Sequence, residues 1–195
     1  MEVSNKRFSA EQFLANLGGR EDNHVHVRIP EARQCLEGFM RREIGDTFKW
    51  LPEYEEVADW LADNKGKGLL CMGNNGRGKT LICSKAIPAM LRYFMGKVAY
   101  CCDALRMAED AENLRYAFLL SIDDIGVEPV ASDYGNKLYM LPEIADDAEK
   151  KGKMLILTTN LPSRDLAAKY GARTLDRLRG LCKVVVFQGE SMRQI

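Results

Sequence analysis

The feature that most constrains this chain is a glycine-rich run that follows a short apolar stretch. The run consists of Gly73, Asn74, Asn75, Gly76, Arg77, Gly78, Lys79 and Thr80, and it matches the pattern G-x-x-x-x-G-K-[ST]. It lies between the apolar residues 69–72 and a helical stretch that begins at Leu81, which is the strand–loop–helix context that the pattern requires. In such a loop the glycines let successive backbone N–H groups point at phosphate oxygens, and the helix adds the positive end of its dipole. We therefore predict that residues 73–81 bind the phosphates of a nucleotide.

Individual loop residues suggest separate tasks. Lys79 is expected to contact the β- and γ-phosphates as a point charge, and the Thr80 hydroxyl is expected to ligate Mg²⁺. Arg77 occupies a position that the pattern leaves free, so we expect its side chain to face solvent.

Two further apolar runs end in polar residues. Residues 118–122 lead into Asp123 and Asp124, and residues 155–159 lead into Asn160. Carboxylates at the carboxyl end of a parallel strand reach the phosphate crevice of an open α/β sheet. Asp123 is thus expected to hold Mg²⁺, and Asp124 to orient or deprotonate an attacking water. If its strand lies between the other two, Asn160 could bind the γ-phosphate or that water. Taken alone, these residues would also suit ordinary strand ends.

The alternation of apolar and amphipathic segments predicts the fold. Five short apolar runs are separated by amphipathic segments, and they are Leu69–Met72, Val98–Cys102, Phe118–Ile122, Met154–Thr158 and Val184–Phe187. Repeated β-α units of this kind predict a central, mainly parallel five-stranded sheet with helices on both faces. The expected fold class is therefore a three-layer α/β P-loop domain.

Other segments predict helices at residues 9–17, 31–43 and 52–64, and residues 103–117 leave room for one more. With 195 residues the chain should build one core. We divide it into a short N-terminal helical or linker region, residues 1–46, which could bind a partner, and a core domain, residues 47–195.

Composition limits the other possibilities. The 28 basic and 28 acidic residues cancel, which excludes a strongly polybasic protein and leaves only a local patch for any nucleic acid. Residues 164–183 hold six basic and two acidic residues, which form either such a patch or solvated helix faces.

The six cysteines lack the paired spacings of zinc or redox sites, so we expect reduced core residues. No apolar run reaches about 18 residues, and we expect a cytoplasmic protein without membrane contact.

In their order along the chain, the phosphate loop, the Asp-Asp strand end, the Thr-Thr-Asn strand end and a late Asp-Arg-Leu element resemble an AAA+ ATPase. More narrowly, they are similar to the helicase-loader family typified by DnaC and DnaI, and to its relative, the IstB transposition helper. The resemblance runs from about Thr47 to the C-terminus and includes residues 122–126, 158–162 and 189–193.

This resemblance implies an enzyme that binds and hydrolyses ATP with Mg²⁺. It implies that Asn160 is the sensor-1 residue and that Arg177 is the arginine finger of a neighbouring subunit's ATP site, hence an ATP-dependent homo-oligomer. Arg193 matches the family's closing arginine and would respond to the bound nucleotide. The partners that the resemblance implies are a replicative DNA helicase and single-stranded DNA, and it implies no C-terminal lid domain after Ile195.

Two alternatives remain open from the sequence. An IstB-like transposition helper would share the ATP site and differ in its partner. A nucleotide-dependent interaction module would bind ATP with little turnover. Spacing alone also allows Arg177 to cover a helix face within its own chain.

Overall fold

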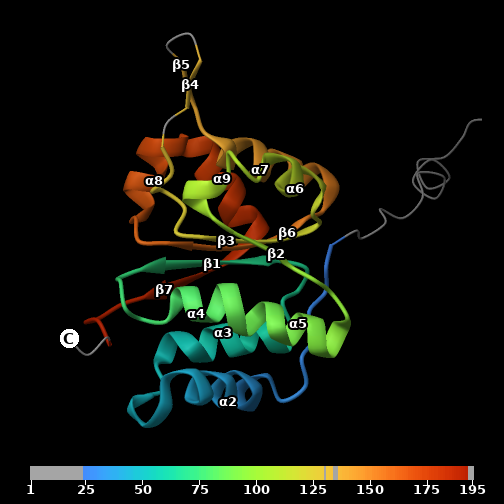
Figure 1. Ribbon diagram of the computed structural model, residues 1–195, viewed down its shortest axis with the longest axis vertical. Coiled ribbons are helices and arrows are strands. Elements are labelled where there is room, and N and C mark those ends of the chain that lie inside the picture. Colours follow the sequence, from blue (N-terminus) through green and yellow to red (C-terminus); the bar gives the residue numbers. More distant parts are fainter. Residues whose placement is uncertain (1–23, 130, 134–135, 193–195) are drawn as a thin grey trace, which may run out of the picture.

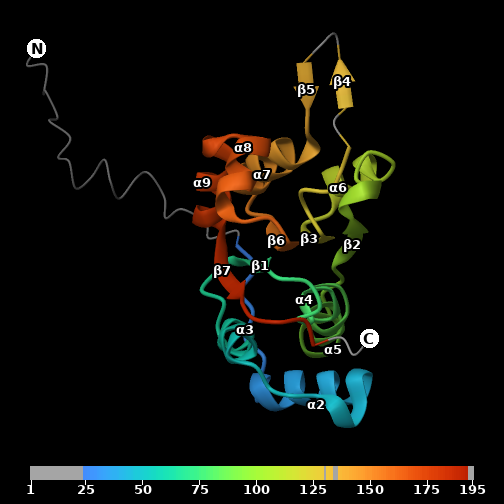
Figure 2. The same ribbon diagram turned by 90° about the vertical axis from the view of Figure 1, so that its left-hand side faces the viewer.

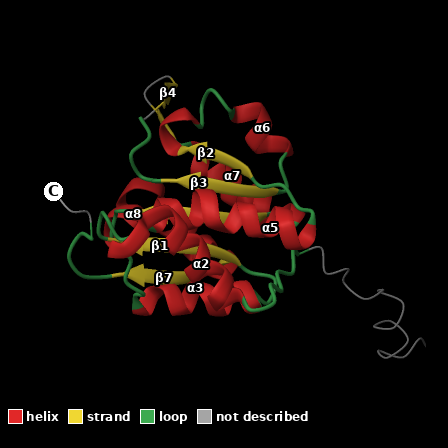
Figure 3. Cartoon of the chain, turned by 60° about the horizontal axis from the view of Figure 1, so that its bottom comes forward, coloured by secondary structure: helices red, strands yellow, loops and turns green. Residues whose placement is uncertain are grey.

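A parallel sheet of five strands forms the centre of the molecule. The computed structural model describes residues 24–129, 131–133 and 136–192. The strands are β1 (Gly68–Gly73), β2 (Tyr100–Asp103), β3 (Leu119–Asp123), β6 (Met154–Thr159) and β7 (Cys182–Phe187). They lie in the order β2-β3-β6-β1-β7, and each neighbouring pair is parallel. Figure 3 shows β2 beside β3 and β1 beside β7. The five predicted strands are confirmed, and β6 lies between β1 and β3 as the Asn160 hypothesis requires.

Helices cover both faces of this sheet, as Figure 1 shows. One face carries α2 (Ala32–Ile44), α3 (Pro52–Ala62) and the helix after β1, and the other carries α6 (Ala111–Tyr116), α7 (Met140–Lys151), α8 (Ser163–Tyr170) and α9 (Ala172–Leu181). Successive side chains of a strand point to opposite faces. In β1, Leu69 and Cys71 accordingly join the first core and Leu70 and Met72 the second. The three-layer α/β architecture is confirmed.

The helix that follows the phosphate loop is less regular than predicted. It comprises α4 (Lys79–Leu81), a π-helical turn at Ile82–Ala86 and α5 (Ile87–Met95). Pro88 has no N–H to donate, which interrupts the regular i→i−4 ladder at this point. The carbonyl of Cys83 accepts a hydrogen bond of 2.9 Å from the Ser121 hydroxyl on β3. This bond ties the helix directly to the sheet.

The N-terminal part of the described chain packs on the same core as α3. Val27 and Leu36 are fully buried there together with Leu69. The buried amide of Asn64 accepts from the Val27 N–H and donates to the Val25 carbonyl, both over 2.8 Å. The boundary between residues 46 and 47 stays a prediction, and the predicted helix at residues 9–17 lies outside the described residues.

Two short strands were not predicted. β4 (Ala131–Asp133) and β5 (Asn136–Leu138) form an antiparallel hairpin between β3 and α7. Figure 2 shows it projecting away from the helical layer. The segment lacks the apolar run by which the sheet strands were recognised. Residues 103–117 hold α6, as predicted, preceded by a short 3-10 turn at Ala104–Arg106.

The cysteine prediction is largely confirmed. Cys71, Cys83, Cys102 and Cys182 are buried free thiols, whereas Cys35 is half-buried and Cys101 is exposed. In the part of the chain that the structure describes, no helix combines the length and the apolar character needed to span a membrane.

Candidate nucleotide site

A pocket of about 680 Å³ opens at the carboxyl ends of the central strands. The phosphate loop forms one wall, and Asp124, Thr158 and Asn160 form another. The apolar side chains of Ile44, Phe48 and Met192 also line the pocket, together with the polar Thr47 and Lys49. The adjacency of β1, β6 and β3 brings these segments together from distant parts of the sequence. Lys79, Thr80, Leu81, Asp124 and Asn160 all line the pocket, as the sequence predicts.

Two glycines of the loop have backbone conformations that other residues rarely adopt. The φ angles of Gly76 and Gly78 are 74° and 83°. A Cβ at Gly76 would also lie 2.0 Å from the Ser191 Oγ, and one at Gly78 would lie 2.8 Å from the Tyr54 hydroxyl. The loop is therefore enclosed by neighbouring segments, and its glycines are required by both backbone angle and space.

The Lys79 ammonium is the positive centre of the site. Its Nζ donates to the carbonyls of Gly73 and Asn74 over 2.8 and 2.7 Å, and to Asn160 Oδ1 over 2.9 Å. Burial lowers the pKa of Lys79, and the Asp124 carboxylate partly opposes that shift. These three acceptors hold the ammonium between the loop and β6, where an incoming phosphate would meet it.

The two acids at the end of β3 are connected to β6. Asn160 Nδ2 donates to Asp124 Oδ1 over 2.6 Å, so a chain of hydrogen bonds runs from Lys79 through Asn160 to Asp124. Burial raises the pKa of Asp124, and the neighbouring Asp123 carboxylate raises it further. The Thr158 hydroxyl contacts both acids, a role that the sequence analysis missed.

The oxygen donors present fit a magnesium ion that is shared with phosphate. Mg²⁺ in nucleotide sites usually takes one or two protein oxygens together with phosphate oxygens and water. Thr80 offers a hydroxyl in the pocket lining. Asp123 offers a carboxylate at the end of β3, beside the lining residue Asp124 and not itself part of the lining. Within the described ranges no cluster of three His, Cys, Asp or Glu side chains could hold a metal by itself. Phosphate oxygens and water would supply the remaining ligands of a Mg²⁺ ion held by Thr80 and Asp123.

The expectation that Arg77 faces solvent is wrong. Its Nε and Nη2 donate to Glu53 Oε1 over 2.7 and 2.5 Å, and its Nη1 donates to the Glu190 carbonyl over 3.3 Å. The Tyr54 hydroxyl donates to the Arg77 carbonyl over 3.0 Å. The guanidinium is therefore neutralised by Glu53 behind the loop, and only the backbone of this residue is left for a phosphate. Glu53 shares a helix face with the buried Val57. An acid on an apolar helix face indicates a buried charge that needs a basic partner, and this signal was overlooked.

The C-terminal described residues lie against the same loop. Asn74 Nδ2 donates to the Gly189 carbonyl over 2.8 Å, and the Met192 N–H donates to the Gly76 carbonyl over 3.0 Å. The segment that ends the resemblance therefore contacts the loop through its backbone. Arg193, the residue expected to respond to nucleotide, lies outside the described residues.

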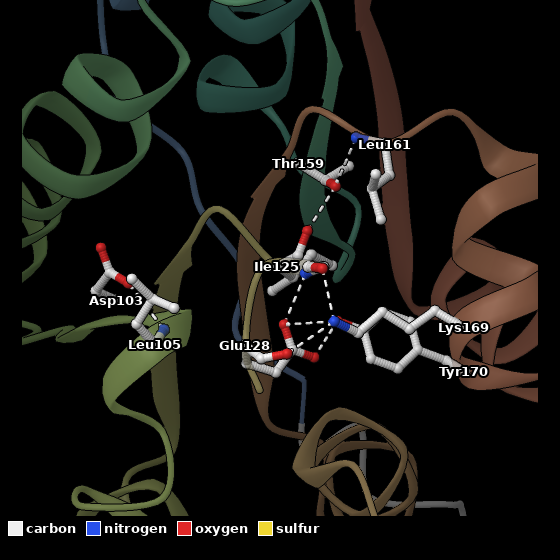
Figure 4. Close-up of polar contacts among 9 residues, drawn as sticks. Asp103, Leu105, Ile125, Glu128, Thr159, Leu161, Lys169 and Tyr170 are labelled. Carbon is white, nitrogen blue, oxygen red and sulfur yellow. Dashed lines mark hydrogen bonds and ion pairs between the residues drawn. The ribbon is translucent and has the colours of Figure 1, made fainter. Parts of the chain in front are cut away.

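The loop after Asp124 is held by a buried network around Glu128, which Figure 4 shows. Glu128 Oε2 accepts from the Gly126 N–H over 2.8 Å, and its Oε1 accepts from the Tyr170 hydroxyl. Lys169 Nζ donates to the Gly126 and Glu128 carbonyls over 2.6 and 2.9 Å. Burial, with Glu128 beside it, raises the pKa of the Tyr170 phenol. The network ties this loop to α8, and sequence reasoning did not identify it.

Arg177 is outside the pocket and is paired within its own chain. It donates to Asp146 Oδ1 over 3.1 Å and to Glu149 Oε2 over 2.7 Å, and its side chain is 13% exposed. A role in a neighbouring subunit stays a prediction. Lys169 is engaged as well, whereas Arg164, Arg173 and Arg179 are exposed, so the basic residues of segment 164–183 are only partly open to solvent.

Comparison with known proteins places this fold. The structure of the DnaC helicase loader matches with 20% identity and a TM-score of 0.59, over 73% of this chain and 95% of that one. DnaI matches with 18% identity and a TM-score of 0.54, over 84% and 83%. AMPPCP-bound DnaA from Aquifex aeolicus matches with 15% identity and a TM-score of 0.54, over 72% and 48%. No protein-family model and no curated protein matches the sequence. The chain has the P-loop AAA+ fold.

Proposed function

We propose that this protein binds ATP with Mg²⁺ and hydrolyses it. The observation that carries the proposal is the hydrogen-bonded chain from Lys79 through Asn160 to Asp124, at the mouth of a glycine-rich phosphate loop. It brings a cation, an amide and a carboxylate to one pocket. These are the groups needed to bind a terminal phosphate and to orient a water beside it.

Each residue has a distinct task in this proposal. The backbone N–H groups of residues 74–80 and the Lys79 ammonium bind the phosphates. Thr80 and Asp123 hold Mg²⁺, which when bound supplies neutralisation of the phosphate charge. Asp124 accepts a proton from the attacking water, and Asn160 orients that carboxylate. The apolar side chains of Ile44, Phe48 and Met192 in the pocket lining would contact the face of the adenine base.

We further propose that the protein is a cytoplasmic DNA-replication accessory ATPase that couples ATP to binding of single-stranded DNA and a replicative helicase. The likeness to DnaC and DnaI supports this setting. In an ATP-dependent homo-oligomer, Arg177 would leave Asp146 and Glu149 and reach the ATP site of the neighbouring subunit. Arg193 would respond to the nucleotide.

The test is ATP turnover per protomer over a protein concentration series, with and without single-stranded DNA. We expect turnover that rises with both. Retention of the replicative helicase from the same cell by ATP-bound protein at micromolar concentration would support the loader assignment. If the helicase is never retained and double-stranded DNA is bound instead, the transposition-helper alternative is favoured. Tight ATP binding with flat, negligible turnover would favour a nucleotide-dependent interaction module.

A further inference from the structure

Thr158 contacts three consecutive residues at the end of β3. Its hydroxyl donates to Asp123 Oδ1 over 2.6 Å and accepts from the Asp124 N–H over 2.7 Å. Its carbonyl accepts from the Ile125 N–H over 2.8 Å. The side chain is attached to β6, which pairs with β3 on one side and β1 on the other. A single buried residue of a central strand thus fixes both acids of the candidate site.

The contact with Asp124 matters because of the backbone there. Asp124 has a φ of 59°, in the left-handed region that residues other than glycine rarely occupy. Such a conformation persists only where surrounding contacts impose it. The Thr158 hydroxyl supplies one such contact at the N–H, and Asn160 holds the carboxylate of the same residue. Threonine is suited to this place because its hydroxyl both donates and accepts, and because its branched side chain has few rotamers.

We propose that Thr158 is a positioning residue that sets the relative orientation of the Asp123 and Asp124 carboxylates. It acts through these acids and does not itself contact the reacting atoms. The inference rests on the proposed ATPase function. By holding Asp123 through a side-chain bond and Asp124 through a backbone bond, one hydroxyl couples the magnesium-holding acid to the water-orienting acid.

Thr159 provides a matched control. It is the next residue of the same strand and is equally buried, with exposed fractions of 1% for Thr158 and 0% for Thr159. Its hydroxyl donates to the Ile125 carbonyl over 2.7 Å and accepts from the Leu161 N–H over 3.1 Å, as Figure 4 shows. Both threonines therefore use the hydroxyl as donor and acceptor, but only that of Thr158 bonds to the acids.

The experiment compares Thr158→Val, Thr158→Ser and Thr159→Val in the full chain. We expect Thr158→Val to lower kcat about 10- to 100-fold, as misplaced reacting groups do, with KM within about threefold. Thr158→Ser should restore most of the turnover, because serine keeps the hydroxyl. Thr158→Val and Thr159→Val should lower the melting temperature by similar amounts, because each removes one buried hydroxyl. Thr159→Val should nevertheless keep kcat within about threefold of the wild type.

A second readout does not depend on turnover. The affinity for ATP is measured with Mg²⁺ and with EDTA, and the gain that Mg²⁺ gives is compared among the variants. Thr158→Val should reduce this gain, and Thr159→Val should leave it unchanged. Wild-type turnover and an unaltered Mg²⁺ gain in Thr158→Val would overturn the inference, as would equal losses in both valine variants. A wild-type chain that binds ATP without turnover would contradict the proposed hydrolysis alone, since the Mg²⁺ comparison still tests Thr158. A wild-type chain that binds no ATP would overturn both.

Discussion

Arg77 and Glu53 form a buried ion pair behind the phosphate loop, with side chains only 9% and 6% exposed. Glu53 lies in the first turn of α3, so the pair joins the loop to the helix layer beneath it. Breaking such a pair leaves one charge buried without compensation, which costs about 3 to 5 kcal/mol. The loop conformation should therefore depend on a residue far from any phosphate.

Replacing Glu53 tests this dependence. We expect Glu53→Gln to lower the free energy of unfolding by about 3 kcal/mol, at the low end because glutamine still accepts from Arg77. Affinity for ATP should fall as well, by about tenfold, because the loop loses its anchor. Chemical denaturation and titration of a fluorescent ATP analogue measure the two effects. Glu56→Gln, an exposed position of the same helix, is the control, and an equal loss there would contradict the anchoring role.

The Lys79 ammonium should dominate nucleotide affinity. Charge-assisted hydrogen bonds contribute about 1.5 to 3 kcal/mol, so Lys79→Ala should weaken ATP binding by about 100-fold and bring turnover below detection. Isothermal titration calorimetry with ATP measures the loss. Lys97→Ala, an exposed lysine, serves as the charge-matched control. Retained affinity in Lys79→Ala would remove the phosphate-loop assignment.

Asp124 should affect the chemical step and not the binding step. Asp124→Asn keeps an oxygen that can accept from Asn160 but removes the proton acceptor. We expect ATP affinity within about threefold of the wild type and kcat lowered about 100- to 10,000-fold, the range typical of general bases. Asp103→Asn is the control. Asp103 lies beside Asp123 in the sheet register, but its carboxylate caps the following turn, so this variant should keep most of the turnover. Unchanged turnover in Asp124→Asn would exclude Asp124 from the mechanism.

The role proposed for Arg177 can be tested by mixing variants. Arg177→Ala and Asp124→Asn should each bind ATP and turn it over poorly. If sites are shared between subunits, a mixture should regain turnover, because an Asp124→Asn subunit lends its Arg177 to the intact acids of an Arg177→Ala subunit. Arg179→Ala, an exposed position on the same helix, should behave as the wild type. Normal hydrolysis by monomeric Arg177→Ala would show that the arginine acts only in its pairs with α7.

The parts of the site that could be predicted are those formed by residues that are adjacent in the sequence. The phosphate loop and the Asp123-Asp124 strand end each combine a motif with an apolar run, and β6 lies where the Asn160 hypothesis needs it. The sheet was predictable for a related reason, since strands buried on both faces are continuous apolar runs.

What the sequence did not reveal depends on contacts between distant residues. Glu53, the partner of Arg77, lies 24 positions away on another element. The phosphate-loop pattern allows any residue at position 77, so it gives no indication of this partner. Thr158 was seen only as part of a strand, because its task depends on which strand lies next to β6. Glu128 likewise acquires its role from α8, 42 residues further along at Tyr170. The hairpin β4–β5 is too short and too polar to give a periodic signal.

The order of the strands also determines when the site can exist. β6 is inserted between β1 and β3, although it follows both along the chain. Until Met154–Thr159 has been synthesised and has entered the sheet, the loop after β1 and the acids after β3 have no shared wall. Contacts of such long sequence separation form slowly. A nascent or truncated chain that stops before β6 should therefore hold no nucleotide, and nucleotide binding can serve as a direct report that β6 has entered the sheet.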